Sequence, residues 1–313
     1  MNKPYSFAGN FPYNNYNQVL KKEFGGRVQK ISIHAGLTCP NRDGTKGRGG
    51  CTYCNNQSFV PEYCHPTKSI TQQVNEGIDF FKRKYENQAY LAYFQSYTNT
   101  YDTLENLIQI YEEALSHPKV KGIVIGTRPD CVNDEILKYF AQLSEKYYVM
   151  IEYGVETTEN GTLSFINRGH DYECSVEAIR KTATLGIKTG AHLILGLPLE
   201  AKETILNHAR KISELPLTAI KLHQLQLIKG TTMAHQFNAH PEWFRLMSAD
   251  EYIDLAIDFL ELLRPDIAVE RFVSQSPSEF LISPDWGLKN FEFVAKIEKR
   301  LRERNTWQGR LVN

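Results

Sequence analysis

Residues 36–54 read GLTCPNRDGTKGRGGCTYC and come after residues 28–34, a short run with β-branched residues that is typical of a β-strand. Three cysteines lie in this stretch, with the spacing Cys39-x11-Cys51-x2-Cys54. The segment from Gly44 to Gly50 is rich in glycine, which lets the backbone fold tightly and point N–H groups at a bound group. The stretch therefore predicts a loop, placed after the first strand, that holds a metal centre.

Two kinds of metal centre suit these cysteines. Three thiolates can hold three irons of a [4Fe–4S] cubane and leave the fourth iron open. Alternatively, Cys64 could join them in a tetrahedral Cys₄ zinc site, because C-x₂-C is a common zinc half-site. The sequence contains no second C-x₂-C pair, and the spacing alone leaves both centres open.

Beyond the cysteine loop, short β-branched or aromatic runs alternate with amphipathic helical patterns. We expect strands at residues 28–34, 89–95, 122–127, 148–154, 188–195 and 219–226, and a weaker one at 267–273. We expect helices at residues 69–87, 103–116, 133–146, 172–185, 248–264 and 289–304. This repetition predicts right-handed strand–helix–strand units.

The expected fold is α/β, a partial, open (β/α)6–7 barrel of the TIM type, with the active site at the carboxyl ends of the strands. A doubly wound sheet is the rival architecture. We divide the chain into an N-terminal arm at residues 1–27, the barrel at residues 28–275, and a C-terminal helical extension at residues 276–313.

The composition limits the class of partner. Lys plus Arg number 36, equal to Asp plus Glu at 36, so the whole-molecule charge does not argue for nucleic acid. Residues 1–50 and 289–313 are nevertheless basic, and would form a basic face if the two ends met in space. No signal-peptide pattern and no long apolar run are present, so we expect a soluble cytoplasmic protein without a membrane partner.

Several motifs together identify a family resemblance. The run CPNRDGTKGRGGCTYC, residues 39–54, resembles the YtqA/YhcC subgroup of the radical S-adenosylmethionine (radical SAM) superfamily, which is similar to the radical domain of the Elongator catalytic subunit. Further motifs at strand ends agree in order and position. They are TRPD at 127–130, EYGVET at 152–157, NRGH at 167–170 and HLILGLP at 192–198.

The resemblance implies specific roles for residues. Cys39, Cys51 and Cys54 are the expected ligands of one [4Fe–4S] cluster. The expected contacts of S-adenosylmethionine are Gln95, Glu156, Arg168 and Arg180, with Glu156 on the ribose hydroxyls and the two arginines as candidates for the carboxylate. The Gly-Gly-Glu form of the amino-group-binding motif is missing after the second strand, where Gln95 stands instead. No single catalytic residue is assigned.

The resemblance also implies a reaction. Cleavage of S-adenosylmethionine would give a 5′-deoxyadenosyl radical, with a reductant such as flavodoxin or ferredoxin as electron donor. The subgroup points to tRNA as substrate, with a wobble 5-carboxymethylaminomethyl-2-thiouridine remodelled toward its aminomethyl or methylaminomethyl form. A run of aromatic residues from Tyr5 to Tyr16 could stack on a base, or pack as an arm on the barrel. The alternatives are a radical enzyme acting on a small metabolite and a non-catalytic, zinc-stabilised RNA-binding module.

Overall fold

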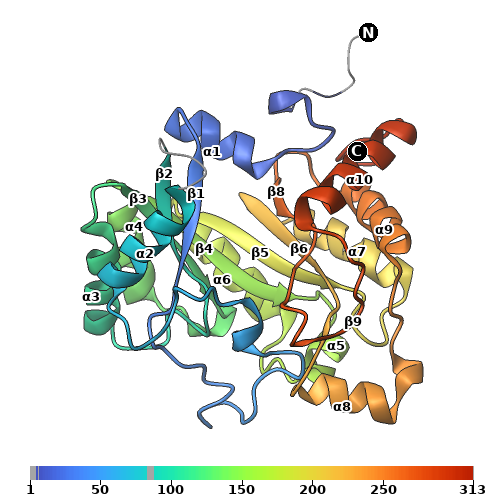
Figure 1. The fold of residues 1–313 in the computed structure, drawn as a ribbon, viewed down its shortest axis with the longest axis horizontal. Coiled ribbons are helices and arrows are strands. Elements are labelled where there is room, and N and C mark those ends of the chain that lie inside the picture. Colours follow the sequence, from blue (N-terminus) through green and yellow to red (C-terminus); the bar gives the residue numbers. More distant parts are fainter. Residues whose placement is uncertain (1–4, 6, 83–87, 313) are drawn as a thin grey trace.

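Seven parallel strands form one curved sheet in the computed structural model, which describes residues 5, 7–82 and 88–312. The strands are β1 (Val28–Ile33), β2 (Ala89–Phe94), β3 (Val120–Thr127), β4 (Tyr148–Glu156), β5 (Lys188–Leu195), β6 (Ala219–Gln224) and β8 (Ala268–Arg271). They pair in this order, and no ladder joins β8 back to β1 within the described ranges. The open partial barrel is therefore confirmed, and the doubly wound sheet, whose strand order reverses, is excluded (Figure 1).

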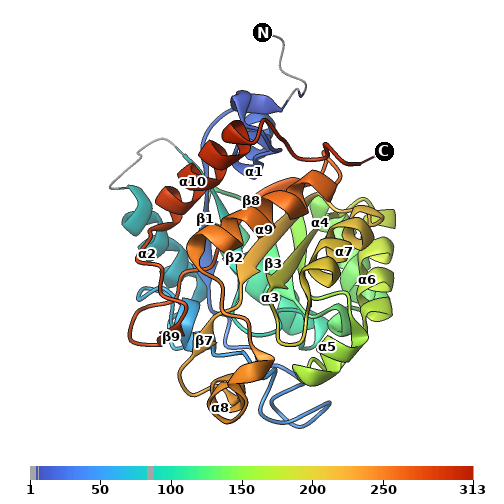
Figure 2. The same cartoon turned by 90° about the vertical axis from the view of Figure 1, so that its right-hand side faces the viewer.

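Helices cover the outer face of the sheet (Figures 1 and 2). They include α2 (Ile70–Lys82), α3 (Leu104–Leu115), α4 (Asp134–Ser144), α6 (Tyr172–Thr184), α7 (Lys202–Ser213) and α9 (Ala249–Leu262). Helix α10 (Asn290–Glu303) packs on α9. Each crossover buries one apolar stripe of a helix against the sheet, which explains why the outward-facing residues of the strands are apolar.

Most of the expected elements form with nearly the expected ends. Ser248 and Glu251 make the capping box that opens α9, and Asn133 caps α4 by accepting from the backbone N–H of Ile136 at 2.9 Å. The last part of the first expected helix, residues 83–87, lies outside the described residues. The sequence analysis missed four helices and a short two-stranded sheet. They are α1 (Tyr16–Phe24), α5 (Asn160–Phe165), α7, α8 (Thr232–Ala239) and the antiparallel pair β7 (Leu227–Ile228) and β9 (Leu281–Ser283).

The N-terminal arm closes the amino end of the barrel. Helix α1 contacts both edge strands, β1 and β8, and inserts Tyr16 among the strands, where its hydroxyl lies 2.8 Å from that of Tyr148. Tyr13 and Tyr16 are each only 1% exposed. These two rings therefore cannot stack on a nucleic-acid base, and for them the structure shows the other alternative, packing of the arm on the barrel. They pack as part of the core.

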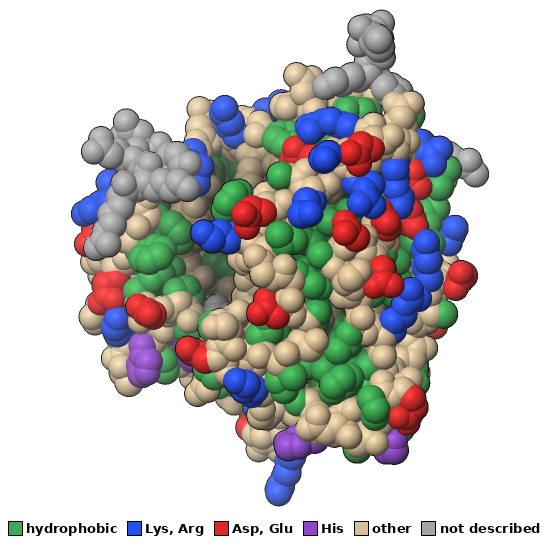
Figure 3. Space-filling view, turned by 45° about the vertical axis from the view of Figure 1, so that its right-hand side comes forward, with side chains coloured by type: hydrophobic (Ala, Val, Ile, Leu, Met, Phe, Trp, Pro, Cys, Tyr) green, Lys and Arg blue, Asp and Glu red, His purple; other side chains and the backbone are tan. Residues whose placement is uncertain are grey.

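The two ends of the chain meet, as the basic-face expectation required. The backbone N–H of Asn14 donates to Oε1 of Gln308 at 2.9 Å, and that of Gln308 donates to the carbonyl of Pro12 at 3.0 Å. However, Arg300 and Arg304 of the C-terminal segment pair with acidic residues of α9. Basic and acidic side chains accordingly intermingle over α9 and α10, and this face carries no uniform basic patch (Figure 3).

The barrel interior has two layers beneath its carboxyl end. The lower layer is apolar and packs on α1. Its buried members are Tyr16, Leu20, Leu91, Tyr93, Val124, Tyr148, Met150, Ala219 and Ala268. The upper layer is charged and forms the floor of a cavity. No described helix is long and apolar enough to cross a membrane.

Candidate active site

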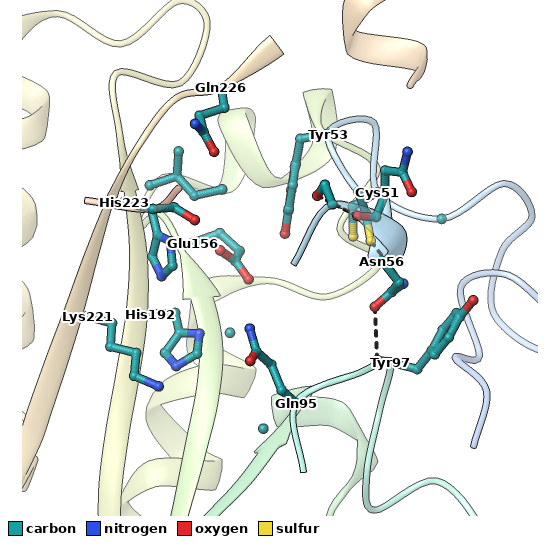
Figure 4. A pocket seen from close by; sticks show the side chains of 18 of the residues that line it. Cys51, Tyr53, Asn56, Gln95, Tyr97, Glu156, His192, Lys221, His223 and Gln226 are labelled. Atoms are coloured by element: carbon teal, nitrogen blue, oxygen red, sulfur yellow. Dashed lines mark hydrogen bonds between the residues drawn. The ribbon is translucent and has the colours of Figure 1, made fainter. Parts of the chain in front are cut away.

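An open cavity of about 240 Å³ lies at the carboxyl ends of the strands (Figure 4). The cysteine loop forms one wall, where Cys39, Cys51 and Cys54 all line the cavity. Strands β4, β5, β6 and β8 supply the opposite wall and the floor, with the side chains of Glu152, Glu156, Ile194, His192, Lys221, His223 and Arg271. The structure thus places the predicted metal-binding loop where a TIM-type barrel carries its active site.

Backbone hydrogen bonds fix the cysteine loop over the barrel. The N–H of Thr52 donates to the carbonyl of Ile166 beyond α5 at 2.9 Å, and the carbonyl of Thr52 accepts from Met233 of α8 at 2.8 Å. The guanidinium of Arg42 donates to the carbonyl of Cys54 at 2.7 Å. The loop is therefore held from both sides even though it contains little regular secondary structure.

Polar N–H groups point at the cysteine sulfurs. Nδ2 of Asn41 lies 3.7 Å from Sγ of Cys51, and Nη1 of Arg168 lies 3.6 Å from the same sulfur. Nδ2 of Asn56 lies 3.6 Å from Sγ of Cys54 (Figure 4). Such donors stabilise the negative charge of thiolates that hold an iron–sulfur cluster.

Burial shapes the chemistry of these thiols. It raises the pKa of Cys54, and the neighbouring Cys51 adds to the effect. Thiolate is the form that binds metal, so deprotonation here depends on a positively charged metal centre as well as on the N–H donors. The donor set fits a [4Fe–4S] cluster.

Cys64 does not belong to this site. It lies in the hydrophobic core outside the cavity, 4% exposed, and its Sγ donates to Oε1 of Gln73 at 3.3 Å. Burial raises the pKa of its thiol to about 12. Across the described ranges, no three His, Cys, Asp or Glu side chains are grouped to hold a single metal ion. The Cys₄ zinc alternative needs Cys64 and therefore does not fit, whereas a cubane, whose irons and sulfides lie between its ligands, takes more widely spaced thiolates.

Arg168 and Glu156, both expected to contact S-adenosylmethionine, lie together at the cavity. Nη2 of Arg168 lies 3.7 Å from Oε1 of Glu156 and also donates to the carbonyl of Gly154. A Cβ on Gly154 would lie only 2.4 Å from the carboxylate of Glu156 and 2.7 Å from the guanidinium, so a larger residue here would displace these two side-chain ends. Nε of Arg168 is buried and finds no partner among the described residues.

The backbone of Glu156 explains how its side chain reaches the cavity. The register of β4 against β5 shifts between Gly154 and Glu156, and Glu156 has a φ of +69°. A positive φ is costly for a residue other than glycine and clusters at functional sites. Together the shift and the turn direct the carboxylate into the cavity, beside Tyr53 (Figure 4).

The two other residues expected to contact S-adenosylmethionine differ in position. Gln95 lines the cavity at the end of β2 (Figure 4), and the turn after it is anchored by Asn56, whose Oδ1 accepts from the N–H of Tyr97 at 3.1 Å. Arg180 does not reach this cavity. It is exposed on α6 and lines a separate surface hollow with Tyr172. Arg180 points away because it falls on the outer, solvent-facing side of a covering helix.

A closed network of charges forms the cavity floor. Nζ of Lys30 lies 2.7 Å from Glu152 and 2.6 Å from Glu270, and Nζ of Lys221 lies 2.6 Å and 3.2 Å from the same two carboxylates. His192 adds a contact to Glu152 at 3.0 Å. Burial would raise the pKa of Glu152, but Lys221 and Lys30, aided by His192, hold it well below its usual range.

The sequence analysis missed several residues that line the site or bond to it. Two of them, Asn41 and Asn56, flank the cysteines in the sequence, and Arg128 lies within a quoted motif. Lys221 and His223 alternate with apolar residues in β6, which is the sign of an inward face that carries polar groups. Arg271 ends a strand that was predicted only weakly and gave no such signal.

Comparison with known proteins identifies relatives along most of the chain. The family described as "Radical SAM superfamily" matches residues 41–212, and "Radical_SAM C-terminal domain" matches residues 217–303. The chain is 36% identical to YtqA of Bacillus subtilis over 307 residues, which cover 96% of this chain and 95% of YtqA. It is 33% identical to YhcC of Escherichia coli K12 over 293 residues, which cover 93% and 92% of the two chains. The predicted resemblance to this subgroup is confirmed.

Two more distant relatives carry informative names. A "tRNA uridine(34) acetyltransferase" of Methanocaldococcus jannaschii is 28% identical over 134 residues, which cover 42% of this chain and 24% of that protein. Among solved structures, the Elp3 protein of Methanocaldococcus infernus superposes with a TM-score of 0.68 at 15% identity, and the match covers 90% of this chain and 64% of that one. The latter likeness shows a shared fold.

Proposed function

The chain belongs to the radical SAM superfamily, whose cofactors are a [4Fe–4S] cluster and S-adenosylmethionine, and we propose that Cys39, Cys51 and Cys54 are its cluster ligands. When bound, the two cofactors supply a 5′-deoxyadenosyl radical that abstracts a hydrogen atom from the substrate. The observation that carries the assignment is the convergence of side-chain N–H donors on the sulfurs of Cys51 and Cys54 inside the barrel cavity.

The residues around the cysteines have separable roles in this proposal. Asn41 and Asn56 donate to sulfur and tune the thiolates. Arg168 bridges Cys51 and Glu156, and its remaining Nε–H is free for the carboxylate of S-adenosylmethionine. Glu156 accepts from the ribose hydroxyls, and Gln95 binds the amino group. Arg180 has no place in this site.

The cluster assignment is tested by metal content. The protein is purified without oxygen, and iron, sulfide and zinc are counted in wild type, Cys54→Ala and Cys64→Ala. We expect about four irons in wild type and in Cys64→Ala, and a loss of iron in Cys54→Ala. One zinc per chain in wild type, lost equally in both variants, would reinstate the Cys₄ site.

For the substrate, we propose a wobble uridine of tRNA, whose 5-carboxymethylaminomethyl side chain is shortened toward the aminomethyl or methylaminomethyl form. Three points support this choice: the subgroup resemblance, the uridine(34)-modifying relative, and the fold shared with Elp3. The reaction needs a reductant, and we propose a flavodoxin or a ferredoxin. We also propose the division into arm (1–27), barrel (28–275) and extension (276–313).

One observation favours a small metabolite as the second candidate. Arg300 and Arg304 are neutralised by carboxylates of α9, so the C-terminal segment offers few free cations to a polyanion. The two candidates are separated by nucleoside analysis. Bulk tRNA from a strain that lacks the gene should accumulate the carboxymethylaminomethyl nucleoside, and the purified enzyme with a reductant should consume it. A normal nucleoside profile in that strain would favour the metabolite.

A further inference from the structure

One cation that lines the cavity has neither a counter-charge nor a hydrogen-bond partner among the described residues. The floor is balanced, because Lys30 and Lys221 share the two carboxylates Glu152 and Glu270. Arg271, at the carboxyl end of β8, also lines the cavity. Within the part of the chain that the structure describes, its side chain makes no ion pair and no hydrogen bond. Its half-buried, unpaired guanidinium is therefore available to an anionic ligand that enters the cavity.

A second polar group beside Arg271 is also unsatisfied. Nε2 of His223 is buried and meets no hydrogen-bond partner among the described residues. Burial lowers the pKa of this imidazole well below its usual range, and the nearby side chains of His192, Arg271 and Lys221 act in the same direction. The ring is therefore neutral at pH 7, and whichever tautomer forms, Nε2 faces no protein partner.

The surrounding backbone holds this corner in place. Gln224 at the end of β6 donates through Nε2 to the carbonyl of Ser274 at 2.8 Å, and its Oε1 accepts from the N–H of Ser274 at the same distance. This pair of bonds ties β6 to the segment that follows Arg271. The backbone that carries Arg271 is thus tied to β6 as well as to its own strand, which suits a preorganised binding site.

This corner lies across the cavity from the cysteines. His223 and Lys221 project from the far strand, while Cys51 and Asn56 lie on the opposite side, with Tyr53 and Glu156 between them (Figure 4). Arg168, which touches Cys51, is the arginine placed for the cofactor. A ligand group at Arg271 therefore belongs to the molecule on which the cofactor's radical acts.

We propose that Arg271, assisted by His223, binds a carboxylate of the substrate. One uncompensated guanidinium balances one negative charge and matches a carboxylate with two parallel hydrogen bonds. A phosphate monoester, with about −1.5 to −2 charges at pH 7, would exceed the free charge at this site. This inference rests on the proposed function, in which the group bound is the carboxylate of the carboxymethylaminomethyl side chain.

The test measures binding to the cluster-loaded protein by equilibrium dialysis. Its two probes are 5-carboxymethylaminomethyluridine and 5-aminomethyluridine, which differ by the carboxymethyl group. Wild type should prefer the first by about tenfold or more, and Arg271→Gln should abolish the preference while binding S-adenosylmethionine as wild type does. Arg271→Lys keeps the charge without the paired geometry and should retain a partial preference. Arg180→Gln, a matched change on the outside of α6, should leave both probes unaffected.

Three results would overturn the inference. The first is a wild type that binds both nucleosides equally, and the second is an Arg271→Gln variant that still prefers the carboxymethyl probe. The third is an Arg271→Gln variant whose affinity for S-adenosylmethionine falls as much as its affinity for the carboxymethyl probe, which would assign Arg271 to the cofactor. If inorganic phosphate displaced the carboxymethyl probe at a lower concentration than acetate does, the assignment of the ligand as a carboxylate would also be wrong. The proposed function is judged separately on tRNA: if tRNA is unchanged while the preference and its Arg271 dependence hold, the tRNA substrate fails and the carboxylate site stands.

Discussion

The charged side chains in the floor of the cavity are fully paired, whereas several in its walls keep nitrogen atoms without a partner among the described residues. In the floor, Lys30 and Lys221 share Glu152 and Glu270, and every charged group has a partner. In the walls, Arg168 and Arg128 each keep one buried nitrogen without a partner among the described residues. Arg271 makes no ion pair or hydrogen bond with any of these residues. The two regions therefore differ in how completely their charged groups are paired, although both are built from the same residue types.

This difference separates residues that hold the barrel from residues that await ligands. The ion pair between Lys30 on β1 and Glu270 on β8 spans the opening between the two edge strands. The floor network therefore links these strands, which no ladder of backbone hydrogen bonds joins within the described ranges. A complete network lowers the cost of burying charge. Incomplete groups above it remain unfavourable until ligands arrive, which marks them as binding groups.

The largest expected effect is the removal of the shared anion of the floor. Glu152→Gln leaves Lys30 and Lys221 short of a counter-charge in a buried position, so the free energy of unfolding should fall by about 3–5 kcal/mol. Urea denaturation measures it. Glu145→Gln, an exposed glutamate at the end of α4, is the control and should change stability by less than about 0.5 kcal/mol. Equal, small changes in both would mean that the floor network does not stabilise the barrel.

A buried histidine beside the walls makes stability depend on pH. Burial, together with the charge of Arg168, lowers the pKa of His170 to about 4 from the ordinary value of 6.5. Between these values the unfolded chain binds the proton and the folded chain does not. Stability is therefore lost as pH falls from about 6.5 to about 4, by up to about 3 kcal/mol.

The matching measurement compares urea midpoints at several pH values across this window. His170→Gln should flatten the decline, because glutamine does not titrate, whereas the same change at the exposed His235 should leave the slope unaltered. A wild-type slope retained in His170→Gln would show that other groups carry the acid sensitivity.

Some parts of the fold and of the cavity could be predicted from the sequence, and others could not. Strands β1 to β6 and the cysteine loop were predictable, because apolar runs and cysteine spacing are local signals. Glu156, Arg168 and Gln95 were found through motifs at strand ends. Arg271 was missed because its distinguishing feature is the lack of a counter-charge, and the neighbours of a side chain are known only once the barrel is assembled. Arg180 was misplaced because spacing alone did not fix which face of α6 it occupies.

A smaller effect is expected from one hydrogen bond to sulfur. Asn56→Ala removes the Nδ2 donor to Cys54, so the reduced, more negative cluster loses stabilisation. The reduction potential should become more negative by roughly tens of millivolts, read from a redox titration followed by electron paramagnetic resonance. Asn75→Ala, at an exposed position of α2, should not shift it. A shift of the opposite sign would contradict the role of Asn56 as donor.

The smallest effect belongs to the ion pairs between α9 and α10 at the surface. Arg300 bonds to Asp254 and lies 3.2 Å from Asp250, but its side chain is 31% exposed, so water and salt screen both contacts. Arg300→Gln should lower the free energy of unfolding by less than about 1 kcal/mol, and by still less in 1 M salt. Urea denaturation of Arg300→Gln, Asp254→Asn and the double variant, at low and high salt, measures the coupling. A coupling as large as the loss expected for Glu152→Gln would mean that burial and completeness do not distinguish the two networks.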